Sequence, residues 1–429
     1  MLTGALFQEN VFLGNFQNDP EFVENWREDL ARFASNYVTT FPEPFAKMSQ
    51  EEFEASIDRL HNNIPSLSSQ QIIVEFMKLV ASIEDGHTWL LPQQAATGYR
   101  MLPLRVYHFS DGLFVTDADS GFQSMIGGKV IRIGDTGIEE ITTALTPLVS
   151  HDNEMTILDR IAEYYLFPEL LQALGFVENA DQVSWTIQKM DGSTETFLIS
   201  PISPDEYLDW IEPTPANPAI YPTPLPQRED ALYLQRLKEN FWMTHLEEPD
   251  VLYIQYNGIA STSVSESGTR TTVRLFSNRL GEFLDEHLET PVIVDIRHTF
   301  GGLGGASTSL LNVLTTHEAF NQPEKLFLIL GRRTFSAAVV FADQLRAGAN
   351  VTLVGEPSGG GVNFFAAARP IRLLNSQLTI NISSSPIRSV RDDDLPWHAP
   401  DILANLSSTD FFNGHDPSLE AIFKHLISK

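Results

Sequence analysis

The chain has 429 residues, of which 42% are apolar and 20% are charged, a composition typical of folded globular proteins and not of disordered ones. Its 56 acidic residues outnumber 28 Lys and Arg, and the formal charge of -28 argues against binding to nucleic acid or to an anionic membrane surface. The chain has no cysteine, which excludes disulfides, thiolate nucleophiles and cysteine–zinc sites.

The length predicts two or three domains. The first residues, MLTGALFQENVF, lack the basic region and the apolar run of a signal peptide. No apolar stretch reaches the roughly 18 residues that a membrane-spanning helix needs. We therefore expect no membrane span, in a protein that is either cytoplasmic or secreted after a leader has been removed.

Residues 1–95 have the pattern of a helical region. Apolar residues recur at helical spacing over 20–38 and again over 68–83. Asp85 and Gly86 follow the second segment and are typical of a helix end. His87 comes next, so we expect rigid structure to hold this residue while its ring faces a cleft.

Residues 96–200 change to the pattern of short strands. The runs LPLRVYHF, GLFVTDA and GKVIRIG are separated by Asp-Gly and Gly-Gly turns. The runs SWTIQKM and ETFLIS flank Asp191 and Gly192, which predicts a hairpin. The size and order of these elements suit a small peptide-binding module, although many small α+β domains share the pattern.

Residues 201–245 begin with the proline-dense segment 201–227, which predicts a linker or an extended surface segment. In the remainder, 246–429, apolar runs typical of buried strands alternate with segments of helical spacing at 303–316 and 335–347. The strand-like runs are VLYIQYN, PVIVDI, KLFLIL and VTLVG. This alternation predicts an α/β layer structure, in which functional residues lie where strands end and helices begin.

Ser336 opens a predicted helix directly after a strand and a short turn, in the sequence KLFLILGRRTFSAAVVFADQL. A helix N-terminus contributes partial positive charge and unpaired N–H groups, which favour an alkoxide and then an oxyanion. Serine is also favoured at this place for capping alone, so its position does not by itself establish a nucleophile.

A glycine-rich loop follows the strand in PVIVDIRHTFGGLGG. Glycine lets backbone N–H groups approach a ligand closely, so Gly301 or Gly302 could combine with the N–H of Ala337 into a two-donor oxyanion hole. A loop with positive φ would explain one glycine but not four within five residues. A phosphate cradle would end in Gly-Lys-Ser/Thr, and that ending is missing.

Four motifs occur in the order DIRHTFGG, GRRTFSAA, GEPSGGG and DDDLPWHAPDI. Together they resemble the C-terminal-processing (tail-specific) serine peptidase family, which includes tricorn-type peptidases and shares its fold with retinoid-binding repeats. The resemblance covers 290–402 and extends over 80–200, where EDGHT precedes the predicted module, as in the tricorn-like Ser/His branch.

The resemblance implies an α/β fold with four parts. These are an N-terminal helical region that carries the base histidine at 1–95, a PDZ-like α+β module at 96–200, a proline-rich linker at 201–245, and a ClpP/crotonase-like catalytic core of ββα units at 246–429.

The family uses either a serine–lysine dyad or a Ser–His–Glu/Asp arrangement. No lysine occurs between Lys325 and Lys424, so the dyad is excluded and a histidine base is needed. His87 matches the Gly-His-Thr of tricorn-like members. His298 is the alternate base, and its presence with Thr299 departs from the small polar residues usual in that loop.

The third catalytic residue implied by the resemblance is a carboxylate six residues before the proline of Pro-Asp-Ile, which corresponds to Asp394. Asp393 is the alternate, and the triple aspartate could equally be an acidic surface turn. His398, three residues before Asp401, is expected to belong to a structural turn.

These residues imply a serine peptidase that forms an acyl-enzyme on Ser336, with His87 as general base and Gly301, Gly302 and Ala337 as candidate oxyanion donors. The PDZ-like module would bind the C-terminal end of a peptide or protein substrate by strand addition. We expect no metal and no cofactor, and a homo-oligomer is compatible with the sequence. Two alternatives stay open: an enzyme acting on a non-peptide ester or amide, and a non-catalytic protein that binds a hydrophobic ligand on the same fold.

Overall fold

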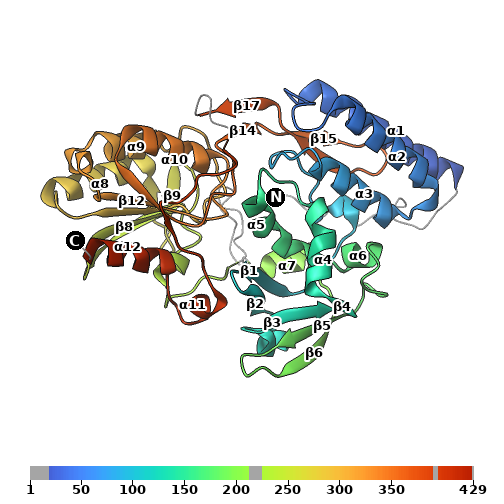
Figure 1. Cartoon of the computed structure of the whole chain (residues 1–429), viewed down its shortest axis with the longest axis horizontal. Coiled ribbons are helices and arrows are strands. Elements are labelled where there is room, and N and C mark those ends of the chain that lie inside the picture. Colours follow the sequence, from blue (N-terminus) through green and yellow to red (C-terminus); the bar gives the residue numbers. More distant parts are fainter. Residues whose placement is uncertain (1–18, 212–224, 390–394, 428–429) are drawn as a thin grey trace.

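The structure is a computed structural model that describes residues 19–211, 225–389 and 395–427. Two lobes lie side by side in Figure 1. The amino-terminal lobe, residues 19–211, carries the first helices and one sheet, and the carboxyl-terminal lobe, residues 225–427, carries the second large sheet. The mixed α/β class predicted from the sequence is confirmed.

The helices of the amino-terminal lobe are α1 (Pro20–Thr40), α2 (Gln50–Asn63), α3 (Ser69–Ala81), α4 (Ile138–Leu145), α5 (Glu154–Tyr164), α6 (Pro168–Ala173) and α7 (Pro204–Ile211). Side-chain caps fix where several of them begin. Asp19 caps α1, and Ser49 and Ser68 form capping boxes with Glu52 and Gln71. Buried apolar residues at helical spacing then hold α1 and α3 in one core, as the periodicity predicts.

The sheet of this lobe has the order β1-β2-β3-β5-β6, and all its pairs are antiparallel. Its strands are β1 (Leu104–Phe109), β2 (Gly112–Ala118), β3 (Lys129–Ile133), β5 (Val183–Gln188) and β6 (Thr194–Ile199), while β4 (Thr136–Gly137) pairs with β3. The predicted hairpin is present, because β5 and β6 pair across the turn at Asp191 and Gly192.

The sheet of the carboxyl-terminal lobe has the order β18-β13-β12-β11-β8-β7, and only β7 runs antiparallel to its neighbour. Its strands are β7 (Phe241–Glu247), β8 (Asp250–Tyr256), β11 (Val292–Asp295), β12 (Leu326–Leu330), β13 (Val351–Gly355) and β18 (Ile402–Leu403). The four predicted apolar runs form the central strands, which are almost wholly buried because both faces are covered.

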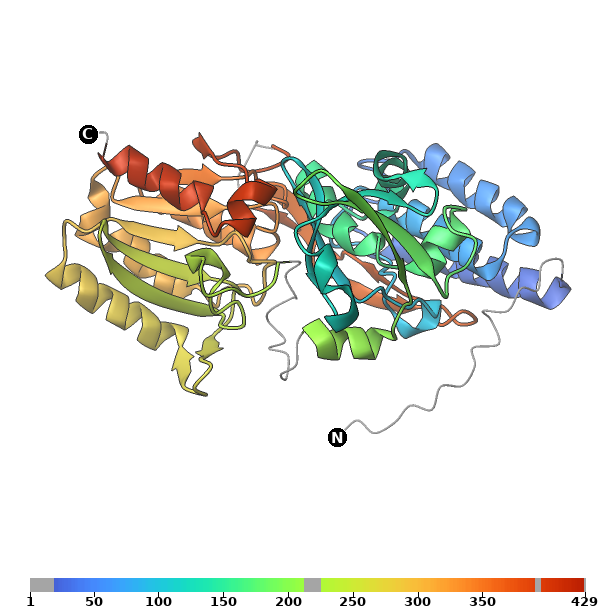
Figure 2. The same cartoon turned by 90° about the horizontal axis from the view of Figure 1, so that it is seen from below.

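Helices cover both faces of this sheet, as Figure 2 shows. Apolar residues of α8 (Val273–Glu286), α9 (Thr308–Thr316) and α10 (Ala337–Gly348) share a core with one face, and α12 (Pro417–Ile427) packs on the other. Alternate residues of β8 divide between the two cores, with Leu252 and Ile254 on one side and Val251 and Tyr253 on the other. The short helix α11 (Ser408–Phe412) precedes α12.

Strands between residues 363 and 388 belong to the carboxyl-terminal half of the chain but pack on the amino-terminal lobe (Figure 1). They form the pairs β14 (Asn363–Ala366) with β17 (Ser385–Arg388) and β15 (Arg369–Arg372) with β16 (Thr379–Ile382). A third small hairpin, β9 (Thr262–Val264) with β10 (Arg270–Thr272), precedes α8. We call the strands within 363–388 the crossing strands; they and the turns between them contribute Phe365, Leu378 and Ile380 to the core of the amino-terminal lobe.

Two predicted helix boundaries are wrong. The helix before His87 ends at Ala81 rather than at Asp85, and the residue with positive φ in the following turn is Glu84 and not Gly86. The helix predicted over 303–316 begins only at Thr308, because Gly302 and Gly305 both have positive φ and interrupt helical geometry. The predicted linker also contains a helix, α7, while its residues 212–224 lie outside the described residues.

Over the described ranges, no helix combines the length and apolar character needed to cross a membrane. No cluster of three or more His, Asp or Glu side chains in these ranges could hold a metal ion.

Candidate active site

Ser336 lies at the turn between strand β12 and helix α10, where it occupies the N-cap position. Its backbone has φ 56° and ψ -124°, a left-handed conformation that is unfavourable for a residue with a side chain. Its hydroxyl makes no capping hydrogen bond to the helix. Capping therefore does not explain this serine, because the strained turn directs the hydroxyl to another group.

That group is His87. The Nε2 atom of His87 lies 2.8 Å from Oγ of Ser336, although the two residues are 249 positions apart in the sequence. The imidazole stacks on Phe335, with ring centroids 4.4 Å apart, and on Phe364 of β14, with centroids 5.3 Å apart. These rings fix the plane of the imidazole and leave His87 only 7% exposed.

Burial lowers the pKa of His87 to about 3, and the nearby positive charge of Arg160 lowers it in the same direction. The imidazole is therefore neutral near pH 7 and able to accept a proton. Its other nitrogen, Nδ1, is buried and has no hydrogen-bond partner among the described residues.

The peptide units around Gly86 are held from both sides. The N–H of Gly86 donates to Oδ1 of Asp152 at 2.6 Å, and the carbonyl of Gly86 accepts from Nη1 of Arg160 at 2.9 Å. A Cβ atom at position 86 would lie 2.8 Å from both Asp152 Oδ1 and the ring of Phe335, so only glycine fits. Asp152 and Arg160 thus position the residue that precedes His87, and the local sequence pattern around them gives no signal of this role.

Residues of the crossing strands hold the other side of the His87 segment. Trp89 and Asn381 exchange two backbone hydrogen bonds of 3.0 Å. The Ser383 hydroxyl donates to Asp85 at 2.6 Å, and the Ser383 N–H donates to the Thr88 hydroxyl at 3.0 Å. These contacts explain how a histidine near the amino terminus reaches a serine in the other lobe.

Two buried carboxyl groups lie behind His87. Burial raises the pKa of Asp85 to about 7, the Asp152 carboxylate raises it in the same direction, and the Ser383 hydroxyl lowers it. Burial also raises the pKa of Asp152, against the lowering effect of the Gly86 N–H. Asp152 further accepts from the N–H of Gly361 at 3.3 Å, so it joins the His87 segment to the GEPSGGG loop.

The glycine loop lies directly against the serine. A Cβ atom at Gly301 would approach Cβ of Ser336 to 2.7 Å and the backbone nitrogen of Ala337 to 3.2 Å. The Phe335 N–H donates to the carbonyl of Thr299 at 3.2 Å and fixes the two loops together. Gly301 and Gly302 have φ of 114° and 136°, which only glycine adopts readily.

Two N–H groups at this junction are not used by regular structure. The N–H of Ala337 is the first of helix α10 and has no acceptor within the helix. Ile259 pairs with Gly302 through the carbonyl of Gly301 and the N–H of Leu303, a pairing that does not use the N–H of Gly302. Gly301 and Ala337 thus lie directly beside Ser336, and Gly302 follows in the same loop with its N–H outside the pairing with Ile259.

His298, the alternate base, has another partner. Its Nε2 lies 3.0 Å from the carbonyl of Tyr233, to which it must donate, and its ring stacks on that of Tyr233. Burial lowers the pKa of His298 to about 3. The neighbouring Thr299 is fully buried and its hydroxyl donates to the carbonyl of Tyr256.

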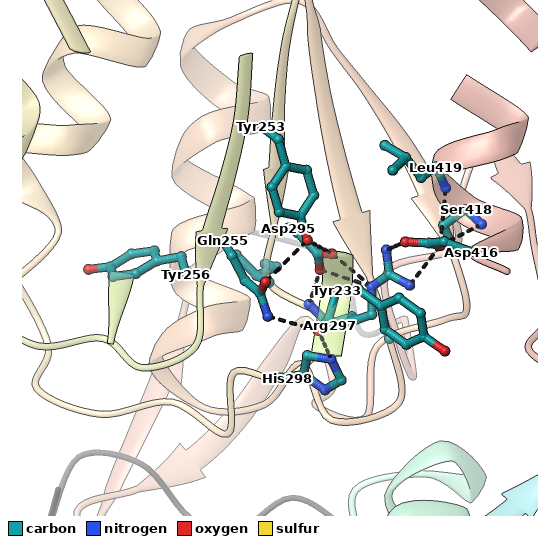
Figure 3. Close-up of polar contacts among 12 residues, drawn as sticks. Tyr233, Tyr253, Gln255, Tyr256, Asp295, Arg297, His298, Asp416, Ser418 and Leu419 are labelled. Atoms are coloured by element: carbon teal, nitrogen blue, oxygen red, sulfur yellow. Dashed lines mark hydrogen bonds and ion pairs between the residues drawn. The ribbon is translucent and has the colours of Figure 1, made fainter. Parts of the chain in front are cut away.

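A buried ionic network anchors the loop that carries these residues, as Figure 3 shows. Nε of Arg297 donates to Asp295 at 2.8 and 3.0 Å, and its two Nη atoms donate to Asp416 at 2.9 and 2.8 Å. Tyr253 donates to Asp295 at 2.7 Å. Because Asp416 also accepts from two N–H groups at the start of α12, the network links the end of β11 to that helix.

The candidate third residues, Asp393 and Asp394, lie outside the described residues. His398 is buried and exchanges hydrogen bonds with Ser358, because its N–H donates to the Ser358 hydroxyl at 2.8 Å and its carbonyl accepts from the Ser358 N–H at 3.2 Å. His398 thus belongs to a turn that supports the GEPSGGG loop, as the sequence predicts.

Comparisons with known proteins rest on structure. No protein-family model and no curated protein sequence matches the chain. Mature CPAF in complex with lactacystin superposes over 94% of this chain and 97% of its own, with a TM-score of 0.63 and 11% identity. A second structure of mature CPAF covers 94% and 96%, with a TM-score of 0.60 and 11% identity.

The chain has the fold of mature CPAF. Weaker likenesses include the photosystem II D1 C-terminal processing protease, which covers 93% of this chain and 96% of its own with a TM-score of 0.42 and 12% identity. At these identities the likeness establishes the fold, and the activity has to be argued from the residues.

Proposed function

We propose that this protein is a serine peptidase that hydrolyses peptide bonds through an acyl-enzyme on Ser336, with His87 as general base. The observation that carries the proposal is the 2.8 Å contact between Nε2 of a neutral, buried histidine and Oγ of a serine on a strained turn. A serine that neither caps its helix nor has relaxed backbone geometry needs another reason for its conformation.

In the first half-reaction, His87 takes the Ser336 proton while Oγ bonds to the substrate carbonyl carbon. His87 then gives this proton to the leaving nitrogen as the carbon–nitrogen bond breaks. In the second half-reaction, His87 takes a proton from water, whose oxygen bonds to the ester carbon. His87 returns this proton to Oγ as the bond between Oγ and the acyl carbon breaks and the acid product leaves. The low pKa of His87 keeps the imidazole available as a base.

The oxyanion is held by the N–H groups of Ala337 and of Gly302, with Gly301 as the alternative donor. Support comes from the closeness of Gly301 to Ser336 and from the two N–H groups that regular structure leaves unused. The N-terminus of α10 adds favourable electrostatic potential at the same place.

The third residue is proposed to be Asp394, or Asp393 after a shift of one position. The buried Nδ1 of His87 needs an acceptor, and the described residues supply none. The chain directly after position 394 is anchored beside the site, because Leu395 accepts from the N–H of Val362 at 3.2 Å and Pro396 accepts from Asn153 at 2.6 Å.

The finer assignment of the fold belongs to the same proposal. Residues 246–429 would form a ClpP/crotonase-like core, residues 1–95 would carry the base, and residues 96–200 would act as a PDZ-like module for the substrate's C-terminal end. The antiparallel sheet of this module ends in β6, an edge strand that could accept an added strand.

Hydrolysis of a non-peptide ester or amide would use the same groups, so substrate profiling is the test. We expect a peptide library to be cleaved by the wild-type protein and not by Ser336→Ala. Turnover of simple esters without any peptide cleavage would favour the alternative, and turnover of neither would favour a non-catalytic binding protein.

A further inference from the structure

A cavity of about 230 Å³ adjoins the candidate active site. It lies mainly in the amino-terminal lobe, between the chain around Trp89, helix α5 and helix α7. Two of its lining residues come from the loops of the site: Phe300 directly precedes Gly301, and Arg333 lies on the turn before Ser336. The rings of Phe300 and Phe335 stack with centroids 5.0 Å apart, and Phe335 directly precedes Ser336, so this ring pair links the cavity lining to the serine.

The volume of the cavity matches that of a single large side chain of a substrate. An apolar cavity of about 150 Å³ holds one benzene molecule, whereas sites for whole drug-sized ligands measure about 300–1,000 Å³. A volume of about 230 Å³ therefore fits an aromatic or large branched side chain, and it is too small for an extended hydrophobic ligand.

The charges around the cavity disfavour a basic occupant. Its lining includes two arginines, Arg160 and Arg333, and two carboxylic acids, Asp159 and Glu163. Arg333 pairs with Asp159 at 3.3 Å. Arg160 donates to the carbonyl groups of Gly86 and Ser150 and lies 4.9 Å from the ring centroid of Phe335.

Glu163 completes this set. Burial raises the pKa of its carboxyl group, which shifts it towards the neutral form. A basic substrate side chain would meet two guanidinium groups here, and a charged side chain of either sign would lose its hydration among the apolar residues of the lining. The remaining lining is mostly apolar, with Leu91, Met101, Tyr164, Tyr207, Leu208 and Ile211.

The geometry points to this cavity as the specificity pocket of the enzyme, which receives one large, uncharged apolar side chain of the substrate next to the bond that is cleaved. The inference rests on the proposed peptidase activity and deepens it. Leu208 of α7 stands at the entrance, since it lines the cavity and is still 50% exposed.

The test compares two exposed leucines. Leu208→Trp adds bulk to the cavity entrance, whereas Leu275→Trp makes the same change on α8, where Leu275 is 43% exposed and does not line the cavity. Cleavage sites are mapped by mass spectrometry in a peptide library. Values of kcat/KM are then measured for peptides that differ at one position beside the scissile bond, with Phe, Leu, Ala, Lys or Glu.

For the wild type we expect kcat/KM to be at least about 10-fold higher with Phe or Leu than with Ala, Lys or Glu. Leu208→Trp should lower the Phe and Leu values about 10-fold and leave the Ala value nearly unchanged, while Leu275→Trp should change none of them. Leu91→Trp, a second substitution in the cavity lining, should have the same effect and replaces Leu208→Trp in the test if that variant does not fold.

Labelling of Ser336 by a small fluorophosphonate separates this inference from the proposed function. A wild-type preference for charged or small residues, or an unchanged preference in both lining variants with Ser336 still labelled, would overturn the pocket assignment alone. Failure of the wild type to label would overturn the proposed function instead.

Discussion

The protonation state of His87 is decided by its burial between Phe335 and Phe364 and by the charge of Arg160. A histidine at the surface has a pKa of about 6.5. In this site the pKa is about 3, so the neutral form persists as the pH falls from 7 towards 4 and is lost only near pH 3. The proposed base therefore stays competent in mildly acidic solution.

We expect the fluorophosphonate labelling rate to keep more than half of its pH 7 value at pH 5, because His87 remains neutral at both values. With a pKa of about 6.5, only about 3% of the histidine would be neutral at pH 5. Circular dichroism at pH 5 serves as the control for folding. A labelling rate that falls with a midpoint near pH 6.5 would contradict the assigned environment.

Asp152 is the residue whose removal should disturb the base without touching substrate. Loss of its carboxylate frees the Gly86 N–H, and a displacement of about 1 Å at a catalytic group can cost about 100-fold in rate. We expect Asp152→Ala to lower the labelling rate of Ser336 by about 10- to 100-fold.

A matched control is Asp58→Ala, at an exposed aspartate on α2 of the same lobe. Partial rescue by Asp152→Asn, which retains one oxygen acceptor, would separate positioning from a general folding defect. Equal labelling rates for Asp152→Ala and the wild type would show that the hydrogen bond from Gly86 to Asp152 is not needed for the reactivity of Ser336.

Local sequence could identify some of these residues but not others. Ser336 was predictable because strand, turn and helix signals converge on it, yet its positive φ and its failure to cap follow from contacts with Gly301 and His87 that no local pattern encodes. Asp152 and Arg160 were missed because their role depends on meeting Gly86, which lies more than 60 positions away.

At the scale of elements, the glycine loop and the turn before α10 act as one unit. The sequence predicts a strand end and a helix start in each. It predicts α9 to begin too early, because the spacing of apolar residues does not show where glycines interrupt a helix. The positive φ of Gly301, Gly302 and Gly305 keeps residues 301–307 out of the helix, and Gly301 lies beside Ser336.

Two glycines of this loop offer a sharp comparison. We expect Gly301→Ala to lower the labelling rate at least about 100-fold, because its Cβ would lie 2.7 Å from Cβ of Ser336 at a φ that alanine avoids. Gly304→Ala has nothing within 4 Å and should label at nearly the wild-type rate. The labelling rate of Ser336 is measured for both variants. Equal rates in Gly301→Ala and Gly304→Ala would contradict the placement of Gly301 against Ser336.

At the scale of the whole molecule, the candidate active site lies where the two lobes meet. His87 comes from one lobe and Ser336 from the other, and the crossing strands 363–388 pair with the His87 segment. Asp29 of α1 fixes these strands, because its carboxylate accepts from the N–H groups of Leu374, Asn375 and Ser376 at 2.9, 3.0 and 2.7 Å. This long-range pairing could not be predicted from periodicity, which reports only on neighbours along the chain.

We expect Asp29→Ala to lower the free energy of unfolding by about 3 kcal/mol, since it leaves three N–H groups without their buried acceptor. Glu24→Ala, at an exposed position of the same helix, should change it by less than about 0.5 kcal/mol. Urea unfolding of both variants measures the difference. A small effect at Asp29 would mean that the crossing strands are held mainly by their apolar contacts.

The central claim is that Ser336, activated by His87, is the nucleophile. The most direct test is labelling of the native protein with a fluorophosphonate, followed by mass spectrometry to locate the adduct. We predict one adduct on Ser336, none in Ser336→Ala, and a strong loss in His87→Ala but not in His298→Asn. An unlabelled wild type, an adduct on another residue, or labelling that depends on His298 and not on His87 would contradict this account.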